Sequence, residues 1–233
     1  MEHIVVTIAR GFGSGGREVA AKLADRLGVH SYANRILTLA SQYSGRDEHD
    51  FVEVDERLRD GYLRQQLLSL QKRLTPVAET RQFQSDDRLF EFQARIIEEL
   101  ARTESCVIVG KAADYVLREF DNVFSVYIEA PRAVCVKRVM AQMHVTESEA
   151  HTMIAKTDKY RAEFYKYYTH GNYWTNPVNY DMTLNSGRLN IESCVDIIFH
   201  GLQVKFGEDF AKAFPGAEVS SMEQSETTLY SIH

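Results

Sequence analysis

The sequence predicts an α/β fold in which helices cover both faces of a parallel β-sheet. Three observations predict this fold. Short apolar runs rich in β-branched residues recur along the chain, a helical pattern follows each run, and glycine often stands at the junction between the two. Because parallel strands can be joined only by a crossover connection, strands that alternate with helices favour a parallel sheet.

The chain begins with a predicted strand, a glycine-rich loop and a helix. Residues 3–9, HIVVTIA, form a short apolar run that predicts a buried strand. After the loop, the segment REVAAKLADRLG repeats apolar residues at four-residue spacing, at Val19, Leu23 and Leu27. Gly28 follows as a C-terminal cap, so this segment predicts an amphipathic helix. Residues 29–33 predict a brief second strand and residues 34–44 a helix after it.

Residues 46–104 contain no convincing strand and predict a helical insert. Residues 47–74 are charged with regularly spaced leucines, and residues 86–101 repeat the helical pattern after Pro76. Two or more helices therefore separate the second strand from the third. The first of these segments also offers a face for a homodimer.

The second half of the chain continues the alternation. Residues 105–110 and 122–130 predict strands, followed by helices at 111–120 and at 132–143, the latter begun by Pro131.

A longer helix, a last strand and a last helix complete the predicted pattern. Thr146 and Glu149 form the signature of a capping box at the start of the longer helix. The last strand is expected at 179–185 and the last helix at 190–206. Residues 206–233 contain one Lys against five acidic residues and are expected to form a flexible acidic tail.

Composition excludes several functional classes. The chain of 233 residues is 44% hydrophobic and 26% charged, as in a globular protein with a substantial core. It contains no apolar run near the ~20 residues needed to cross a bilayer and no signal-peptide pattern at its start, so we expect a cytoplasmic protein without membrane partners. The three cysteines suit reduced thiols. The net charge of −6 argues against nucleic acid as a partner.

The glycine-rich loop predicts a phosphate site. GFGSGGRE reads as Gly-x-x-x-x-Gly followed by Arg17-Glu18, where the usual nucleotide loop has Lys and a hydroxyl residue. Between a strand and a helix, backbone amides and the helix dipole attract phosphate. Arg17 keeps the cationic charge, whereas Glu18 cannot replace the hydroxyl. The alternative is a tight turn that only packs the helix on the sheet.

Over residues 3–205, the chain resembles the cytidylate kinase-like family of nucleoside monophosphate kinases. The segments that carry the resemblance are VTIARGFGSGGREVAAKLADRLG, SCVIVGKAADYVL and DKYRAEFYKYY followed by NYDMTLN. The resemblance implies a P-loop three-layer sandwich formed by residues 1–45 and 105–205, with a lid at about 140–178 and an acceptor-binding insert at 46–104. It also implies transfer of a phosphoryl group from ATP, with Mg²⁺, to a nucleoside monophosphate such as CMP.

The resemblance also assigns roles to residues. The ATP-binding set is Gly11, Phe12, Gly13, Ser14, Gly15, Gly16, Arg17 and Glu18. The proposed catalytic cations are Arg17, Lys111, Arg138 and Arg161. The substrate-binding set is Lys111, Asp114, Asp158 and Arg161. The Mg²⁺ ligands are not predicted.

Three departures from the family pattern leave alternatives open. Glu18 replaces the hydroxyl, Cys135 stands at a lid position that is usually Arg, and Ala33 replaces an Asp. They motivate a nucleotide-binding regulator with weak or no turnover, and a third hypothesis retains the enzyme but changes the acceptor. Seven aromatic residues between Phe164 and Tyr180 either stack on a base or form a packing cluster.

Overall fold

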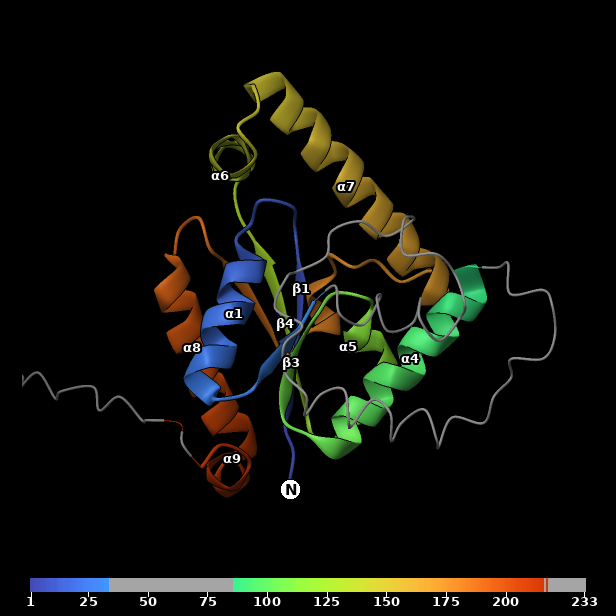
Figure 1. Cartoon of the computed structure of the whole chain (residues 1–233), viewed down its shortest axis with the longest axis vertical. Coiled ribbons are helices and arrows are strands. Elements are labelled where there is room, and N and C mark those ends of the chain that lie inside the picture. Colours follow the sequence, from blue (N-terminus) through green and yellow to red (C-terminus); the bar gives the residue numbers. More distant parts are fainter. Residues whose placement is uncertain (34–85, 216, 218–233) are drawn as a thin grey trace, which may run out of the picture.

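The computed structural model of the chain describes residues 1–33, 86–215 and 217. Five parallel strands form one sheet in the order β2-β3-β1-β4-β5 (Figure 1). Their bounds are β1 Val5–Arg10, β2 His30–Tyr32, β3 Cys106–Val109, β4 Val123–Glu129 and β5 Met182–Asn185. The predicted parallel sheet is confirmed. Because β1 is central and pairs with both β3 and β4, the loop after β1 lies in the middle of the sheet's carboxyl edge.

Helices pack on both faces of this sheet, so the fold has three layers. In Figure 1, α1 (Gly16–Leu27) and α8 (Ile191–Phe206) lie on one side, and α4 (Asp86–Thr103) and α5 (Ala113–Val116) on the other. The strands alternate between the two cores: Val6 and Ile8 pack toward α1 and α8, while Val5 packs toward α4 and α5. This alternation follows from the two-residue period of a strand.

Helix α1 begins and ends at glycines with left-handed backbone. Gly15 precedes it at φ 80° and Gly28 follows it at φ 67°. The amide of Gly28 donates to the carbonyl of Asp25, so the predicted C-terminal cap is confirmed. Since β-carbons are disfavoured at positive φ, glycine suits both ends.

Helix α5 is shorter than the sequence predicts. The helical pattern at residues 111–120 contains only one helical turn, Ala113–Val116. Gly110, Lys111 and Ala112 have φ values of 75°, 63° and 51°. Three consecutive left-handed residues cannot belong to a right-handed helix, so the helix begins only at Ala113.

The two helices after β4 follow the sequence prediction closely. Helix α6 spans Arg132–Met143 and α7 spans Glu147–Tyr168. Thr146 and Glu149 form the predicted capping box, in which the amide of Thr146 donates to the Glu149 carboxylate at 2.8 Å. Helix α7 then crosses above the carboxyl edge of the sheet (Figure 1), and a short 3₁₀ helix, Pro177–Asn179, leads to β5.

This cap permits a direct test. Replacing Thr146 with alanine is expected to lower the free energy of unfolding by about 1 kcal/mol, because the first turn of α7 loses its side-chain acceptor. Urea unfolding measures the change. Thr152→Ala is the matched control, since the Thr152 hydroxyl donates only to a carbonyl of its own helix. Equal effects of the two substitutions would contradict the role of the cap.

The chain continues past α8 in an ordered helix. In place of the flexible tail expected from residue 206, Glu208–Ala213 form α9. Phe210 packs edge-on against Phe199 with ring centroids 5.2 Å apart, and Phe214 is buried beside it. The acidic composition of this segment predicted a flexible tail, but its aromatic residues Phe210 and Phe214 pack into the core. The helices expected at residues 34–44 and 47–74 lie outside the described residues.

Candidate functional site

The loop between β1 and α1 presents backbone amides without partners. Within residues 11–18, the amides of Gly13, Gly15, Arg17 and Glu18 have no hydrogen-bond acceptor among the described residues. The two glycines both have φ 80°, which bends the loop around the start of α1. The first amides of a helix have no intrahelical partner and share the positive end of the helix dipole. The loop is therefore built to receive an anion.

Arg138 supports this loop from beneath. Its Nη1 donates to the carbonyl of Ser14 at 2.8 Å and to Oγ of Ser186 at 3.0 Å, and its Nη2 donates to the Ser186 carbonyl at 3.0 Å. Ser14 is fully buried, and the Ser186 hydroxyl also donates to its carbonyl. Arg138 thus connects α6, the loop and the segment after β5, and its guanidinium is engaged with protein groups.

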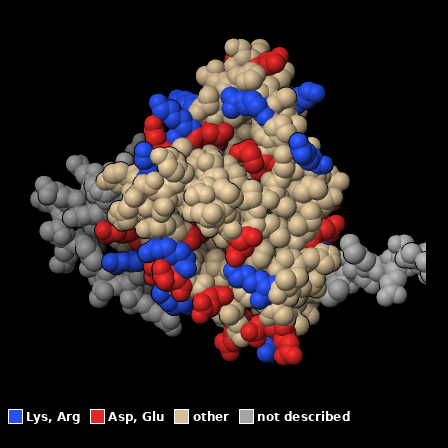
Figure 2. Space-filling model, turned by 180° about the vertical axis from the view of Figure 1, so that it is seen from behind, with Lys and Arg blue, Asp and Glu red and all other residues tan. Residues whose placement is uncertain are grey.

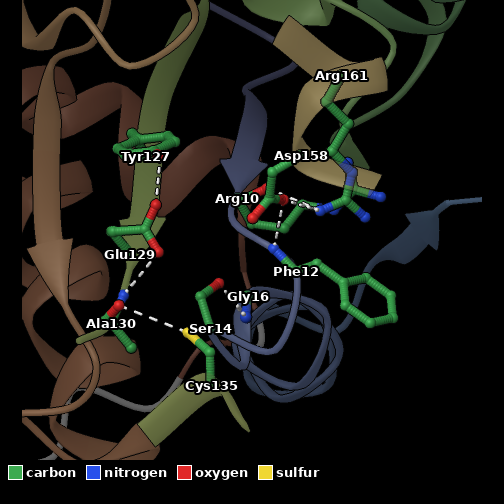
Figure 3. A network of polar contacts seen from close by, with 10 residues as sticks. All are labelled: Arg10, Phe12, Ser14, Gly16, Tyr127, Glu129, Ala130, Cys135, Asp158 and Arg161. Atoms are coloured by element: carbon green, nitrogen blue, oxygen red, sulfur yellow. Dashed lines mark hydrogen bonds and ion pairs between the residues drawn. The ribbon is translucent and has the colours of Figure 1, made fainter. Parts of the chain in front are cut away.

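Asp158 and Arg161 attach α7 to the loop (Figure 3). Oδ1 of Asp158 accepts a hydrogen bond from the amide of Phe12 at 2.8 Å. Nη1 of Arg161 lies 3.4 Å from the same carboxylate oxygen and donates to the carbonyl of Arg10 at 3.1 Å. The sequence predicts that Asp158 and Arg161 share a helix face, and the structure confirms it. Both side chains turn toward the phosphate loop.

Glu129, at the end of β4, places a second carboxylate beside the loop. It accepts hydrogen bonds from the hydroxyl of Tyr127 at 2.6 Å and from the amide of Ala130 at 2.9 Å. A β-carbon on Gly11 would collide with this carboxylate, with 2.8 Å to Oε2. The first glycine of the loop is therefore required by the close approach of Glu129. Burial raises the pKa of Asp158, and the negative charge of Glu129 adds to that shift.

Lys111 lies at the carboxyl end of β3 in a strained conformation. Its φ of 63° is uncommon for a residue with a β-carbon, and such strain concentrates at functional sites. Burial lowers the pKa of Lys111 to about 7, and repulsion from Arg10 and Arg161 contributes. Among the described residues, the Lys111 amine has no hydrogen bond or ion pair. A buried amine without a partner is available to a ligand.

Asp114 lies beneath α7 among aromatic residues. The hydroxyl of Tyr165 donates to its carboxylate at 2.6 Å, and burial raises the pKa of Asp114 to about 6. Tyr180 stacks on Tyr127 with ring centroids 5.4 Å apart, and Trp174 meets Tyr127 edge-on at 5.6 Å. Of the two interpretations of this aromatic-rich segment, the structure supports packing for its buried members, Tyr165, Trp174 and Tyr180.

The remaining predicted positions divide between the surface and the core. Arg17 and Glu18 are exposed in the first turn of α1, where Arg17 is free to turn toward a ligand on the loop. Cys135 is buried, and its thiol donates to the carbonyl of Ala130 at 3.4 Å. Ala33 packs against the core that faces α1. Cys135 and Ala33 are therefore packing residues in this structure.

Sequence reasoning missed three residues that the fold brings to the site: Arg10, Glu129 and Ser186. Arg10 precedes the loop directly and Glu129 ends a predicted strand, so both stand where parallel sheets bind ligands. Their positions at strand ends could have predicted a role in the site. No local sequence feature predicts Ser186, because its role depends on the approach of α6.

The pKa of Lys111 predicts how stability depends on pH. Between about pH 7 and the ordinary lysine value of 10.5, the unfolded chain binds this proton and the folded chain does not. The free energy of unfolding should therefore rise with pH across this range, by up to about 1.4 kcal/mol per pH unit. Urea unfolding of the wild type and Lys111→Met at several pH values measures the difference. Parallel pH profiles would contradict the buried, uncharged lysine.

Comparison with known families identifies the fold. The model of the cytidylate kinase-like family matches residues 5–188, which is most of the chain and includes the loop, Lys111 and α7. The chain belongs to the cytidylate kinase-like family. Membership supports nucleotide-dependent phosphoryl transfer as the general activity and leaves the acceptor undetermined.

One solved structure shares the fold of this chain, and a second is more distant. An uncharacterized protein from Eubacterium ventriosum ATCC 27560 is 24% identical, with a TM-score of 0.63 over 86% of this chain and 99% of the other. A shikimate kinase from Bacteroides thetaiotaomicron is 13% identical, with a TM-score of 0.49 over 86% and 98% of the two chains. No curated protein matches the chain significantly.

On the face shown in Figure 2, Lys and Arg are interspersed with Asp and Glu and form no continuous basic stripe. Among the described helices, none combines the length and apolar character that a bilayer crossing requires.

Proposed function

We propose that this member of the cytidylate kinase-like family transfers a phosphoryl group from ATP to a nucleoside monophosphate, with a CMP-like acceptor. The observation that carries the proposal is the set of unpaired loop amides after β1, together with the unpaired amine of Lys111 at the end of the neighbouring strand β3. Phosphoryl transfer requires positioned positive charge around the phosphates more than covalent chemistry by the protein. Two adjacent anion-binding features suit a donor and an acceptor.

The residues divide into donor and acceptor sides under this proposal. The phosphates of ATP lie on the amides of residues 11–18, and Arg17 neutralises the β- and γ-phosphates with its planar fork. Lys111 and Arg161 bind the acceptor side. Asp158 orients Arg161 and holds the Phe12 amide, and Arg138 acts as a positioning residue through Ser14. Asp114 is placed to orient the acceptor side through Tyr165.

Mg²⁺ is the metal that the family implies. No group of three potential metal ligands occurs among the described residues. Mg²⁺ in kinases, however, needs only one or two carboxylates together with phosphates and water. Glu129 and Asp158 fit this requirement, because both approach the loop and the negative charge of Glu129 raises the pKa of Asp158. Bound there, Mg²⁺ would neutralise charge on the transferred phosphoryl group.

The proposed setting follows from the same features. ATP and nucleoside monophosphates are the expected partners, and the protein is expected to act in the cytoplasm. The mixed surface charge supports small nucleotides as ligands in preference to nucleic acid.

A coupled assay of ADP formation tests the function. Purified protein with ATP and Mg²⁺ is given CMP, UMP, AMP or GMP in turn, and Arg17→Ala protein measures the background. We expect ADP formation above that background with CMP at the highest kcat/KM. No turnover with any monophosphate would exclude the kinase proposal.

A second candidate is a nucleotide-binding regulator. It is favoured by the bond from the Phe12 amide to Asp158, which occupies one donor of the loop, and by Glu18 in place of a hydroxyl. Titration calorimetry with ATP separates the candidates. Binding of ATP without turnover in the assay above would support the regulator.

A further inference from the structure

Arg10 directs a buried positive charge into the acceptor side of the site. Its side chain leaves the end of β1 and passes over Gly16, where a β-carbon would lie 2.5 Å from the Arg10 Cβ and 3.1 Å from its Cγ. Nη1 of Arg10 reaches the space that a β-carbon on Gly110 would occupy. The Arg10 side chain thus runs from the start of α1 to the turn that carries Lys111. Two glycines make room for it.

The Arg10 guanidinium forms no hydrogen bond and no ion pair among the residues that the structure describes. Burial lowers its pKa to about 9, and repulsion from Arg161 and Arg17 contributes, while the negative charge of Asp158 acts in the opposite direction. An unpaired charge that is partly withdrawn from water is destabilising. A protein retains such an unpaired charge where a bound ligand of opposite charge offsets the loss of stability.

The neighbouring charges define which ligand compensates it. Arg10 and Lys111 repel each other, and Arg161 repels both, so three cations converge here. Asp158 attracts Arg10, and both Asp158 and Glu129 attract Arg161, but both carboxylates already accept hydrogen bonds. Among the described residues, Arg10 and Lys111 have no partner, and Lys111, with a pKa of about 7, is protonated in part at neutral pH. The cluster therefore favours a bound anion. A phosphate monoester, with a charge of about −1.5 to −2 at neutral pH, matches it better than a carboxylate does.

We propose that Arg10 is a further substrate-binding residue, which joins Lys111 and Arg161 at the dianionic phosphate of the acceptor and selects phosphate monoesters over carboxylate acceptors. The inference rests on the proposed function for the identity of the acceptor. The pocket itself is testable without turnover. It lies beside the loop that holds the donor, so donor and acceptor phosphates approach each other across Gly16 and Gly110.

Titration with inorganic phosphate tests the pocket. Wild type, Arg10→Met and Arg17→Ala are titrated by calorimetry, each in the absence and presence of saturating ADP, which covers the loop. Arg10→Met retains an unbranched apolar stem over the two glycines. We expect wild-type protein to bind phosphate in the presence of ADP. Arg10→Met should bind phosphate at least about tenfold more weakly, whereas the affinity of Arg17→Ala should differ from that of the wild type by less than about twofold.

Thermal unfolding supplies a second measurement that a merely structural role for Arg10 would not reproduce. Removal of an unpaired buried charge should leave the Tm of Arg10→Met equal to or above that of the wild type. Phosphate should raise the Tm of the wild type and not that of the variant. Acetate should raise neither. If Arg10→Met does not fold, Lys111→Met provides the same comparison.

The outcomes separate this pocket from the kinase proposal. Phosphate binding that is indifferent to Arg10→Met and Lys111→Met overturns the pocket, whatever the kinase assay shows. Loss of phosphate binding in Arg17→Ala, or its abolition by ADP, also overturns it, because phosphate then binds only to the loop. Phosphate binding that depends on Arg10, without ADP formation from any monophosphate, supports the pocket and contradicts the kinase.

Discussion

Replacing Arg17 with alanine is expected to reduce kcat/KM for ATP-dependent phosphoryl transfer by about a thousandfold, or about 4 kcal/mol in transition-state stabilisation. Arg17 is exposed and makes no ion pair within the described residues, so folding should be unaffected. Its fork would contact the transferred phosphates only in the complex with ATP. Steady-state kinetics measure the loss, and urea unfolding verifies the fold.

Two variants sharpen this prediction. Lys22→Ala removes a cation from the same helix but breaks only an exposed surface ion pair with Glu192, which contributes little to stability. It should retain nearly full activity. Arg17→Lys keeps the charge without the fork and should fall between the wild type and Arg17→Ala. Wild-type kinetics in Arg17→Ala would show that the amides suffice and that Arg17 has no role.

The substitution Arg138→Met is expected to lower the free energy of unfolding by about 3 kcal/mol, because the buried carbonyl of Ser186 loses its donor and that of Ser14 loses one of two. The loop should then become more mobile. We expect faster amide exchange at Ser14 and Gly16, whose amides are hydrogen-bonded within the loop, and weaker ATP binding. Urea unfolding and hydrogen exchange measure the two effects.

Lys137→Met is the matched control, since Lys137 is the exposed neighbour of Arg138 on α6. It should change neither stability nor exchange. The sequence resemblance assigns Arg138 to catalysis, whereas its hydrogen bonds suit a positioning role. If Arg138→Met abolished turnover while stability and loop exchange stayed at wild-type values, Arg138 would contact phosphate as the resemblance implies.

Much of the fold could be predicted from local sequence patterns. The strands of the core are short β-branched runs that end at polar or glycine residues, and both the capping box of α7 and the Gly28 cap are local signatures. Helix α5 could not be predicted, because its pattern is apolar at helical spacing while Lys111 and Ala112 adopt left-handed backbone. Helix α9 was hidden by acidic residues around the aromatic contacts of Phe210.

The sequence by itself determined the class of the fold and the phosphate loop, because hydrophobic periodicity and a glycine-rich turn act within a few residues of chain. Only the tertiary structure decided which charges meet. Residues 10, 111 and 161 lie on separate elements, and their repulsion in a buried setting exists only once the sheet orders the strands and α7 crosses its edge. The same packing turned Arg138 toward Ser14 and left Arg10 without a partner. Electrostatic interactions depend on the distance between charges and on their burial, and neither quantity can be inferred from the local sequence.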